Sequence, residues 1–276
     1  FADRVDAVID KPYLALGADL SPQEQMTVLS LLGLSDINVD DYDIISITNA
    51  DEHEYLDKYL DASIIGTRAL SSVLVVGKEA GNGIHVTTKN ISYCTEGMYR
   101  NALLTAGIED ADITVAGPFS ISGTAALVGA IKAYETMTGE EIDDENLDAA
   151  NDELVLTGKL VEDIGDSEKA EDLMALVKQE VAENKLTSAE DIQNVVDQAC
   201  NQLDIQLSEE NQKQIAELMK KIEGLDLDVD KLKDQAKDLY QKLEDLDFHV
   251  DKESVGNFFT RIIDAIVNFF QGLFGK

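Results

Sequence analysis

Residues 113–134, ITVAGPFSISGTAALVGAIKAY, carry the signal that decides the fold of this chain. The first residues are β-branched or small and predict a buried strand, and Gly117 and Pro118 predict a sharp turn after it. From residue 120 onward small residues recur along a segment that is typical of a helix packed closely on a sheet. Strand signals lie before this stretch and helix signals follow it, so we expect the architecture to change here.

Four strands are expected in the first half of the chain. They are predicted over residues 43–48, in a segment that ends near Gly77, over 83–92 and over 111–119, with helices after Asn49, over 94–107 and over 122–137. The order is therefore β-α-β-β-α-β, the ferredoxin-like order, with extra helices. We expect an α+β domain built on a four-stranded antiparallel sheet with helices on one face. A three-layer α/β arrangement is the alternative.

The connecting segments favour the antiparallel sheet. Residues 77–83, GKEAGNG, contain three glycines and predict a hairpin between the second and third strands. Ser21, Pro22 and Glu24 have the spacing of a capping box and predict a helix that ends near Gly33. Residues 1–20 are interpreted as a weakly amphipathic start followed by a loop.

After residue 138 the strand signals end and helices follow one another. They are predicted over residues 143–164, 166–184, 188–203, 208–223, 228–247 and 252–274. The chain therefore divides into an α+β domain, residues 1–139, and an all-helical bundle or hairpin domain, residues 140–276. A heptad pattern over 215–250 is interrupted by GLDLDVD, which favours an antiparallel helix pair over a long coiled coil.

The last predicted helix, residues 252–274, is apolar over most of its circumference. Such a helix is either buried inside the bundle or binds a partner or a membrane surface. It has almost no Lys or Arg, which weakens the case for an anionic membrane, and self-association stays open. The residues of this predicted interaction helix are Phe258, Phe259, Ile262, Ile263, Ile266, Phe269, Phe270, Leu273 and Phe274.

The overall charge excludes one class of partner. The net charge is −33 and the isoelectric point is near 4.1, so the chain repels the phosphates of nucleic acids. The two cysteines, Cys94 and Cys200, are expected to be buried free thiols, with one disulfide bridge as the alternative. No segment reaches the roughly 18 to 20 apolar residues of a membrane span. Because the chain starts at Phe1, we expect that a signal peptide has been removed.

The sequence shows no pattern of catalytic residues. Its three histidines, His53, His85 and His249, lie on separate predicted elements, and the usual motifs for metal-dependent, nucleotide-binding and serine hydrolases are absent. The acidic run that begins at Asp36 resembles a calcium loop, but it has Asp41 in place of the required glycine and lacks the final glutamate. We therefore predict no catalytic residue, no metal site and no cofactor.

The candidate ligand-binding residues lie in three separate segments: the turn at the start of the 122–137 helix, the strand end at Thr48 and Asn49, and the turn that contains Arg68. The start of the 122–137 helix offers hydroxyls and free backbone N–H groups, which bind an anion or a carboxylate well. Simple helix capping is the alternative for these residues, and pairing with nearby carboxylates is the alternative for the arginine. The candidate anion-binding residues are Ser120, Ser122, Gly123, Thr124, Thr48, Asn49 and Arg68.

Six segments together resemble a known family. They are residues 16–25 (LGADLSPQEQ), 46–56 (SITNADEHEYL), 65–73 (IGTRALSSV), 83–92 (GIHVTTKNIS), 98–108 (MYRNALLTAGI) and 115–135 (VAGPFSISGTAALVGAIKAYE). They are similar to the domain of unknown function 1002 family, the YpuA-type secreted proteins of Gram-positive bacteria, over roughly residues 14–250. The resemblance implies export after signal-peptide cleavage. It carries over no activity and no catalytic residue.

These observations lead to two functional hypotheses. The first is a non-catalytic binding or scaffolding protein, extracellular or in the cell envelope, that contacts a protein, an envelope component or a membrane surface through its C-terminal helices. The second is an extracellular hydrolase acting on an envelope polymer, which requires an acid–base pair of shifted pKa in a cleft.

Overall fold

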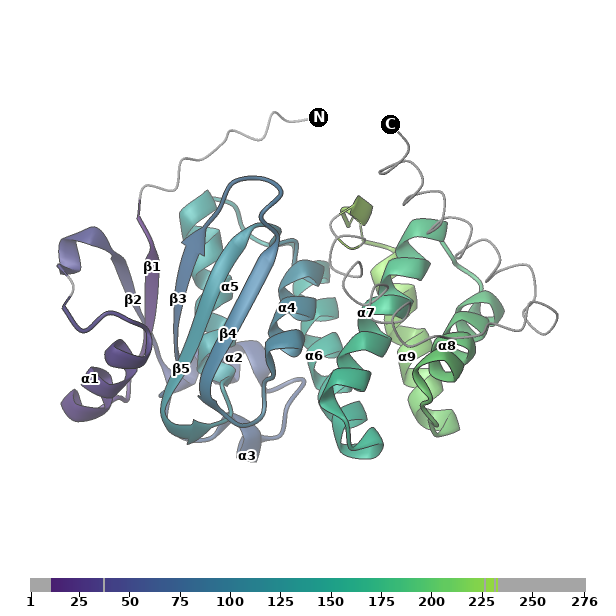
Figure 1. Cartoon of the computed structure of the whole chain (residues 1–276), viewed down its shortest axis with the longest axis horizontal. Helices are drawn as coiled ribbons and strands as arrows, with labels where there is room; N and C mark the ends of the chain where they lie inside the picture. Colours follow the sequence, from purple (N-terminus) through teal and green to yellow (C-terminus); the bar gives the residue numbers. More distant parts are fainter. Residues whose placement is uncertain (1–10, 37, 226, 231, 233–276) are drawn as a thin grey trace, which may run out of the picture. The chain divides into compact units, whose positions relative to one another are not determined.

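A computed structural model of the chain describes residues 11–36, 38–225, 227–230 and 232 (Figure 1). Two of the predicted helices, over residues 228–247 and 252–274, therefore lie outside the described residues for nearly all or all of their length. The nine apolar residues of the predicted interaction helix lie outside them as well, and so does most of the second half of the heptad run.

Five strands form one mixed sheet in the order β2-β1-β3-β5-β4. The strands are β1 (Tyr13–Gly17), β2 (Asp43–Ile47), β3 (Ser72–Gly77), β4 (Ile84–Ile91) and β5 (Ala111–Ile121). β1 pairs with β2 and β4 pairs with β5 in parallel, whereas β3 lies antiparallel between β1 and β5. Four strands therefore run in one direction, and β3 runs against them.

This topology corrects the expected ferredoxin-like, fully antiparallel sheet. The predicted hairpin between β3 and β4 is wrong, because Ile113 of β5 faces Val75 of β3 on one side and Val86 of β4 on the other. β5 is the longest strand, and its neighbours Val115 and Ala116 are buried in the cores on opposite faces of the sheet. A strand buried on both faces gains most from a position inside the sheet. No strand was expected within residues 1–20, which were interpreted as a weakly amphipathic start and a loop, yet β1 is an inner strand. Its five residues are too few to show a clear strand period.

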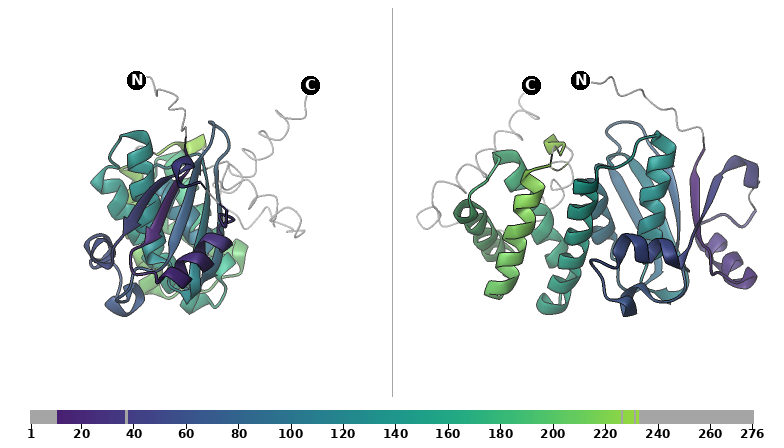
Figure 2. Two further views of the ribbon diagram at one scale, coloured as in Figure 1. Left: turned by 90° about the vertical axis from the view of Figure 1, so that its left-hand side faces the viewer. Right: turned by 180° about the vertical axis from the view of Figure 1, so that it is seen from behind.

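Helices cover both faces of the sheet. One face carries α2 (Asn49–Leu56), α3 (Ala62–Ile65), α4 (Glu96–Thr105) and α5 (Thr124–Thr138), and the other carries α1 (Pro22–Leu31), which is followed by a short 3-10 turn, η1 (Val39–Asp41). The expectation of helices on one face was therefore wrong, and the layered alternative describes the sheet better (Figures 1 and 2).

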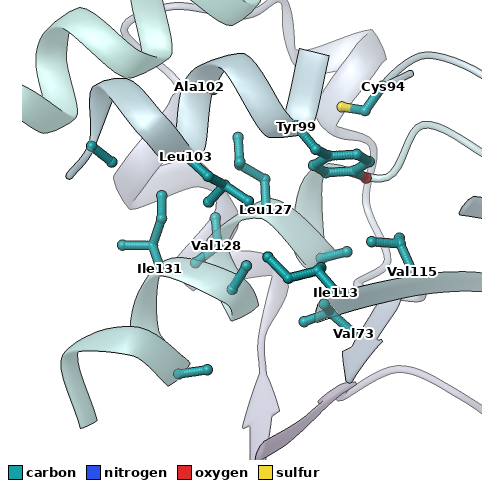
Figure 3. Packing of buried hydrophobic residues seen from close by; sticks show 14 of the residues in the cluster. Val73, Cys94, Tyr99, Ala102, Leu103, Ile113, Val115, Leu127, Val128 and Ile131 are labelled. Atoms are coloured by element: carbon teal, nitrogen blue, oxygen red, sulfur yellow. The ribbon is translucent and has the colours of Figure 1, made fainter. Parts of the chain in front are cut away.

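The main core lies between the sheet and the helices α4 and α5. Leu127, Val128 and Ile131 of α5 and Leu103 of α4 surround the sheet residues Val73, Ile113 and Val115 (Figure 3). All seven are exposed by no more than 2% of their surface, so this layer supplies most of the hydrophobic stabilisation of the sheet.

The small residues of α5 let it approach the sheet closely, as its sequence predicts. A Cβ placed on Gly129 would lie only 2.8 Å from the Cβ of Ala15 and 3.1 Å from Cγ1 of Val73. These distances leave no room for a side chain at this position, since packed interiors have few voids. The glycine thus sets the spacing between the helix and β1.

Four long helices follow the sheet. They are α6 (Asp144–Ile164), α7 (Ser167–Asn184), α8 (Ala189–Leu203) and α9 (Glu209–Glu223), which confirms the predicted helices in this region to within one residue. The Ser188 hydroxyl caps α8 by accepting from the Asp191 N–H at 3.0 Å, and Ser208 caps α9 in the same way. α6 and α7 pack against α4 of the sheet layer. The division at residue 139 stays a prediction.

Helix α7 holds both ends of α4 with opposite charges. Its Glu171 carboxylate lies at the N-terminal end of α4, where it accepts from the Thr95 hydroxyl. Its Lys178 ammonium lies near the C-terminal end, 3.0 Å from the Asn101 carbonyl oxygen and 3.2 Å from the Thr105 hydroxyl. Negative charge at a helix N-terminus and positive charge at its C-terminus are both favourable.

The same lysine forms an ion pair with α6. Its Nζ lies 2.9 Å from Oε1 of Glu153, and both side chains are fully buried. The Thr105 hydroxyl donates to the other carboxylate oxygen, so each charge has more than one partner. Removal of one member of a buried pair leaves the other charge uncompensated, which costs far more than the pair itself contributes.

We therefore predict that Lys178→Met lowers the free energy of unfolding by about 3–5 kcal/mol, because Glu153 stays buried without its counter-charge. The Glu153→Leu/Lys178→Met double variant should recover most of this loss. Urea denaturation followed by circular dichroism measures both effects. Lys159→Met, at an exposed lysine of α6, is the control and should change stability by about 0.5 kcal/mol or less. An equal loss of unfolding free energy in Lys178→Met and Lys159→Met would contradict a stabilising role of the ion pair between Lys178 and Glu153.

Candidate functional site

The sequence-predicted site residues lie near one edge of the sheet. Since β1, β2, β4 and β5 run in one direction, they end at a common edge, at which β3 begins. We call this the carboxyl edge. Thr48 and Asn49 follow β2, Arg68 precedes β3, and Ser122 follows β5. Open α/β sheets bind their ligands at such an edge, which makes it the candidate functional site.

Glu52 of α2 contacts two of the candidate residues at this edge, Thr124 and Asn49. Its side chain is only 1% exposed, and its Oε2 accepts from the Thr124 hydroxyl at 2.5 Å. Asn49 donates from Nδ2 to Oε1 of Glu52 at 3.4 Å and to the Gly66 carbonyl at 3.1 Å. Burial raises the pKa of Glu52, and the hydrogen bonds from Thr124 and Asn49 only partly oppose this shift. The structure thus brings Thr124 and Asn49 together on one carboxyl group.

His53, the next residue of α2, contacts both Asp57 and the carbonyl of Gly66, which Asn49 also contacts. Its Nδ1 lies 2.5 Å from Oδ1 of Asp57, and its Nε2 lies 3.2 Å from the carbonyl oxygen of Gly66. Both neighbours are acceptors, so only the doubly protonated imidazole satisfies both. The hydrogen bond to Asp57 accordingly raises the pKa of His53.

Arg68 forms structural contacts at this edge. Its Nη2 donates to both carboxylate oxygens of Glu24, at 2.8 and 3.1 Å, and to the carbonyl of Asp19 at 3.1 Å. The Asp19 carboxylate in turn accepts from the Ala69 N–H at 2.8 Å. The arginine is therefore paired with a nearby carboxylate, as the alternative interpretation held, and it ties α1 to the start of β3.

Thr48, and not Asn49, caps helix α2. The Thr48 hydroxyl accepts from the Asp51 N–H at 3.1 Å, and the Asp51 carboxylate accepts from the Thr48 N–H at 2.8 Å. This reciprocal capping box leaves the Asn49 amide free to reach Glu52. Lys132 of α5 donates to the same Asp51 carboxylate at 2.8 Å, and this hydrogen bond lowers the pKa of Asp51 to about 2.

The segment after β5 differs from the expected turn and helix start. β5 continues through Gly117 and Pro118 to Ile121, so Ser120 is a strand residue. Asn90 of β4, with φ of 61°, lies at the irregularity between the two strands and donates to the Gly117 carbonyl at 3.1 Å. A bulge keeps a strand in its sheet where a turn is expected from sequence.

A side chain from a distant segment accepts a hydrogen bond from the first turn of α5. Its N-cap is Gly123 at φ of 91°, a conformation that glycine adopts without strain, and no Ser or Thr of the segment caps the helix. The Ser71 hydroxyl, just before β3, accepts from the Ala126 N–H at 2.9 Å instead. The Ser122 hydroxyl lies 3.3 Å from that of Thr124.

Both helix starts that follow the parallel strands β4 and β5 receive a carboxylate from the chain itself. Glu171 lies at the start of α4, and a Cβ on Gly97 would overlap its carboxylate. Glu52 lies at the start of α5. These are the positions at which free N–H groups and the helix dipole would favour a bound anion. Burial raises the pKa of Glu171 as it does that of Glu52.

Both cysteines of the chain are buried. Cys94 and Cys200 are free thiols, as the sequence predicts, and burial raises their pKa values to about 12 and about 11. Thiols with such pKa values are poor nucleophiles near neutral pH. Over the part of the chain that the structure describes, no group of three His, Cys, Asp or Glu is arranged to hold a metal ion, and no helix is long and apolar enough to cross a membrane.

Sequence reasoning missed Glu52, Ser71 and Asp19 as members of this edge. Glu52 resembled an ordinary acid in the first turn of a helix. It lies four residues before the buried Leu56, so its helical position did indicate the buried side of α2. Nothing in the sequence marked the two other residues, since their partners come from distant segments.

Two comparisons with known proteins found a match over most of the chain. Residues 16–239 match the family model described as a protein of unknown function, DUF1002. The chain is 39% identical over 271 residues to the uncharacterized protein YpuA of Bacillus subtilis strain 168, covering 96% of this chain and 92% of that protein. No solved structure matches the chain.

We predict that Glu52→Ala lowers the free energy of unfolding by about 1–3 kcal/mol, because the Thr124 hydroxyl loses its carboxylate acceptor and the Asn49 amide loses one of its two acceptors. Thermal and urea denaturation measure the loss. Glu54→Ala, at an exposed acid of the same helix, should stay within about 0.5 kcal/mol of the unchanged chain. If the two variants were equally stable, the hydrogen bonds of Glu52 to Thr124 and Asn49 would not contribute to the stability of the fold.

We also predict that Asp57→Asn lowers the pKa of His53 towards the ordinary value of 6.5, since the main cause of its rise is removed. Because the folded-state pKa is raised, the stabilisation from this contact is fully present below pH 6.5 and is lost as the pH rises through the folded-state pKa. NMR titration of the imidazole measures the shift. Asp61→Asn, at the next exposed acid, should leave the pKa unchanged.

Proposed function

Since the chain belongs to the DUF1002 family of proteins of unknown function, we propose that it is a secreted or cell-envelope protein that binds or scaffolds other components without catalysing a reaction. The predicted C-terminal helices, which lie outside the described residues, form the interaction arm in this proposal. The described sheet and helices form the folded body of the protein.

The observation that carries this proposal is that side chains of the protein itself fill the carboxyl edge, where a ligand would otherwise bind. Glu52 and Glu171 take the two helix starts, and Ser71 and Thr124 are used in hydrogen bonds between elements. Groups held in this way fix the fold and are not presented to a substrate. An edge that serves packing leaves recognition to other surfaces of the protein.

The charge and the cysteines support a location outside the cytoplasm. A net charge of −33 keeps an exported chain soluble and away from anionic polymers. The two thiols are buried, and their raised pKa values suppress the thiolate that oxidants attack. The chain is thus protected against chance disulfide formation in an oxidising compartment.

The hydrolase hypothesis keeps one supporting observation. A carboxyl group of raised pKa, such as that of Glu52, is what a general acid requires at neutral pH. Glu52 is only 1% exposed, and it already accepts hydrogen bonds from Thr124 and Asn49. Both observations favour the structural role, because a general acid must reach the proton acceptor of its substrate.

The proposal predicts both where the protein resides and what it binds. The chain, produced from its gene in a Gram-positive host, should be found in the medium and envelope fractions and not in the cytoplasm. The purified chain should co-sediment with isolated envelopes or with phosphatidylcholine vesicles. Replacement of Phe258, Phe269 and Phe270 by Ser should weaken co-sedimentation about tenfold or more, because the apolar contact area is lost.

The control uses the polar side of the same predicted helix. Replacement of Asn257, Asn268 and Gln271 by Ser should leave co-sedimentation unchanged. A cytoplasmic location would contradict the proposal, and so would equal binding by the Phe and the polar variants. Turnover of purified envelope polymer that is lost in Glu52→Gln would favour the hydrolase instead.

A further inference from the structure

The connection between β3 and β4 contains a reactive dipeptide. Asn82-Gly83 is the single Asn–Gly pair in the 276-residue sequence. Asn82 is half-buried, and Gly83 has a φ of 73° with nothing within 4 Å of a Cβ placed on it. Glycine after asparagine offers no side chain to obstruct the approach of its backbone nitrogen to the asparagine side chain.

The chemistry of such a pair is deamidation. The backbone nitrogen of Gly83 attacks Cγ of Asn82, a new carbon–nitrogen bond closes a five-membered succinimide, and the side-chain nitrogen leaves as ammonia with the proton that the backbone nitrogen has lost. Water then opens the ring at either carbonyl group. The product at position 82 is an aspartyl or an isoaspartyl residue, and each carries a new negative charge.

Two carboxylates hold the pair in an unreactive geometry. Oδ1 of Asp110 accepts from the Gly83 N–H at 2.8 Å and from the Gly81 N–H at 3.1 Å. The attacking nitrogen therefore directs its hydrogen at Asp110. The Asn82 amide donates from Nδ2 to Oδ1 of Asp112 at 3.1 Å and to the Gly83 carbonyl at 2.9 Å. Both reacting groups are tethered to other partners.

The backbone around the pair is fixed as well. The Ala111 N–H donates to the Gly83 carbonyl at 3.1 Å, and Nε2 of His85 lies 2.9 Å from the Asn82 carbonyl oxygen. Ring closure needs rotation about the Cα–C and Cα–Cβ bonds of Asn82, which brings Cγ to the Gly83 nitrogen. These contacts oppose that rotation as long as the connection stays closed against the start of β5.

We propose that Asn82-Gly83 is a latent deamidation site that the Asp110 carboxylate keeps closed in the folded protein. Opening of the connection exposes the site, and the reaction then prevents it from closing again. A carboxylate at position 82 can no longer donate to Asp112, and it faces Asp110 and Asp112 with a like charge. An isoaspartyl residue also adds a backbone atom just before β4, which disturbs the pairing of Ile84 with Ala111.

The test follows the reaction at one peptide of the full-length chain. Trypsin cleaves after Lys78 and Lys89, and the peptide between them contains Asn82 as its single asparagine. The purified chain is incubated at mildly alkaline pH, with and without urea, and the deamidated and isoaspartyl forms of this peptide are measured by mass spectrometry. Deamidation should be about tenfold slower or more in the folded chain than in urea.

The Asp110→Ala variant tests the carboxylate itself. It should deamidate about tenfold faster or more than the unchanged chain in the absence of urea, because loss of a charged hydrogen-bond acceptor favours opening to this extent. Asp110→Asn keeps an acceptor oxygen and should react more slowly than Asp110→Ala. Glu79→Ala, which removes an exposed acid from the same connection, should react at the rate of the unchanged chain.

Two results would overturn the proposal. The first is equal deamidation of the unchanged chain with and without urea. The second is an unchanged rate in an Asp110→Ala variant that melts as a folded protein. If this variant does not fold, the comparison of the unchanged chain with and without urea decides the matter alone.

Discussion

The charges that α7 places at the two ends of α4 are the constraint on which the rest of the described structure depends. Glu171 and Lys178 lie seven residues apart, two turns along one side of α7. The carboxylate reaches the start of α4 and the ammonium reaches its end, so the pair matches the direction of the α4 dipole. Glu153 of α6 completes the buried pair with Lys178. Apolar contacts alone would allow helices to slide, whereas buried charges need their partners in one arrangement.

Buried charged side chains also hold the carboxyl edge of the sheet together. Glu52 at the start of α5 serves as Glu171 does at the start of α4, and both are buried carboxyls with raised pKa values. Each links elements that are distant in the sequence through a threonine hydroxyl. A position at which many α/β proteins bind anions is here occupied by the chain itself. This is why we place recognition elsewhere and regard these hydroxyls as part of the frame.

Local signals predicted the elements well and their partners poorly. The caps Ser21, Ser188 and Ser208, the helices α6 to α9 and the free thiols follow from residues close in sequence. β1 was missed because five residues in an inner strand show no clear alternation. The hairpin between β3 and β4 was wrong because a glycine-rich connection indicates a change of direction but not which strand becomes the neighbour. Of the candidate site, Thr124 and Asn49 do meet, but on Glu52, an acid for which the sequence predicted no role.

The sequence by itself determined that a run of helices follows the strands, and it determined the family, because composition and periodicity are properties of the linear chain. It also determined the one Asn–Gly pair. Only the tertiary structure decided that β5 lies between β3 and β4, that Glu52 is buried, and that Asp110 restrains Gly83. Each of these depends on a contact between residues far apart in the chain. The free energy of such a contact exists only once the segments between them have folded.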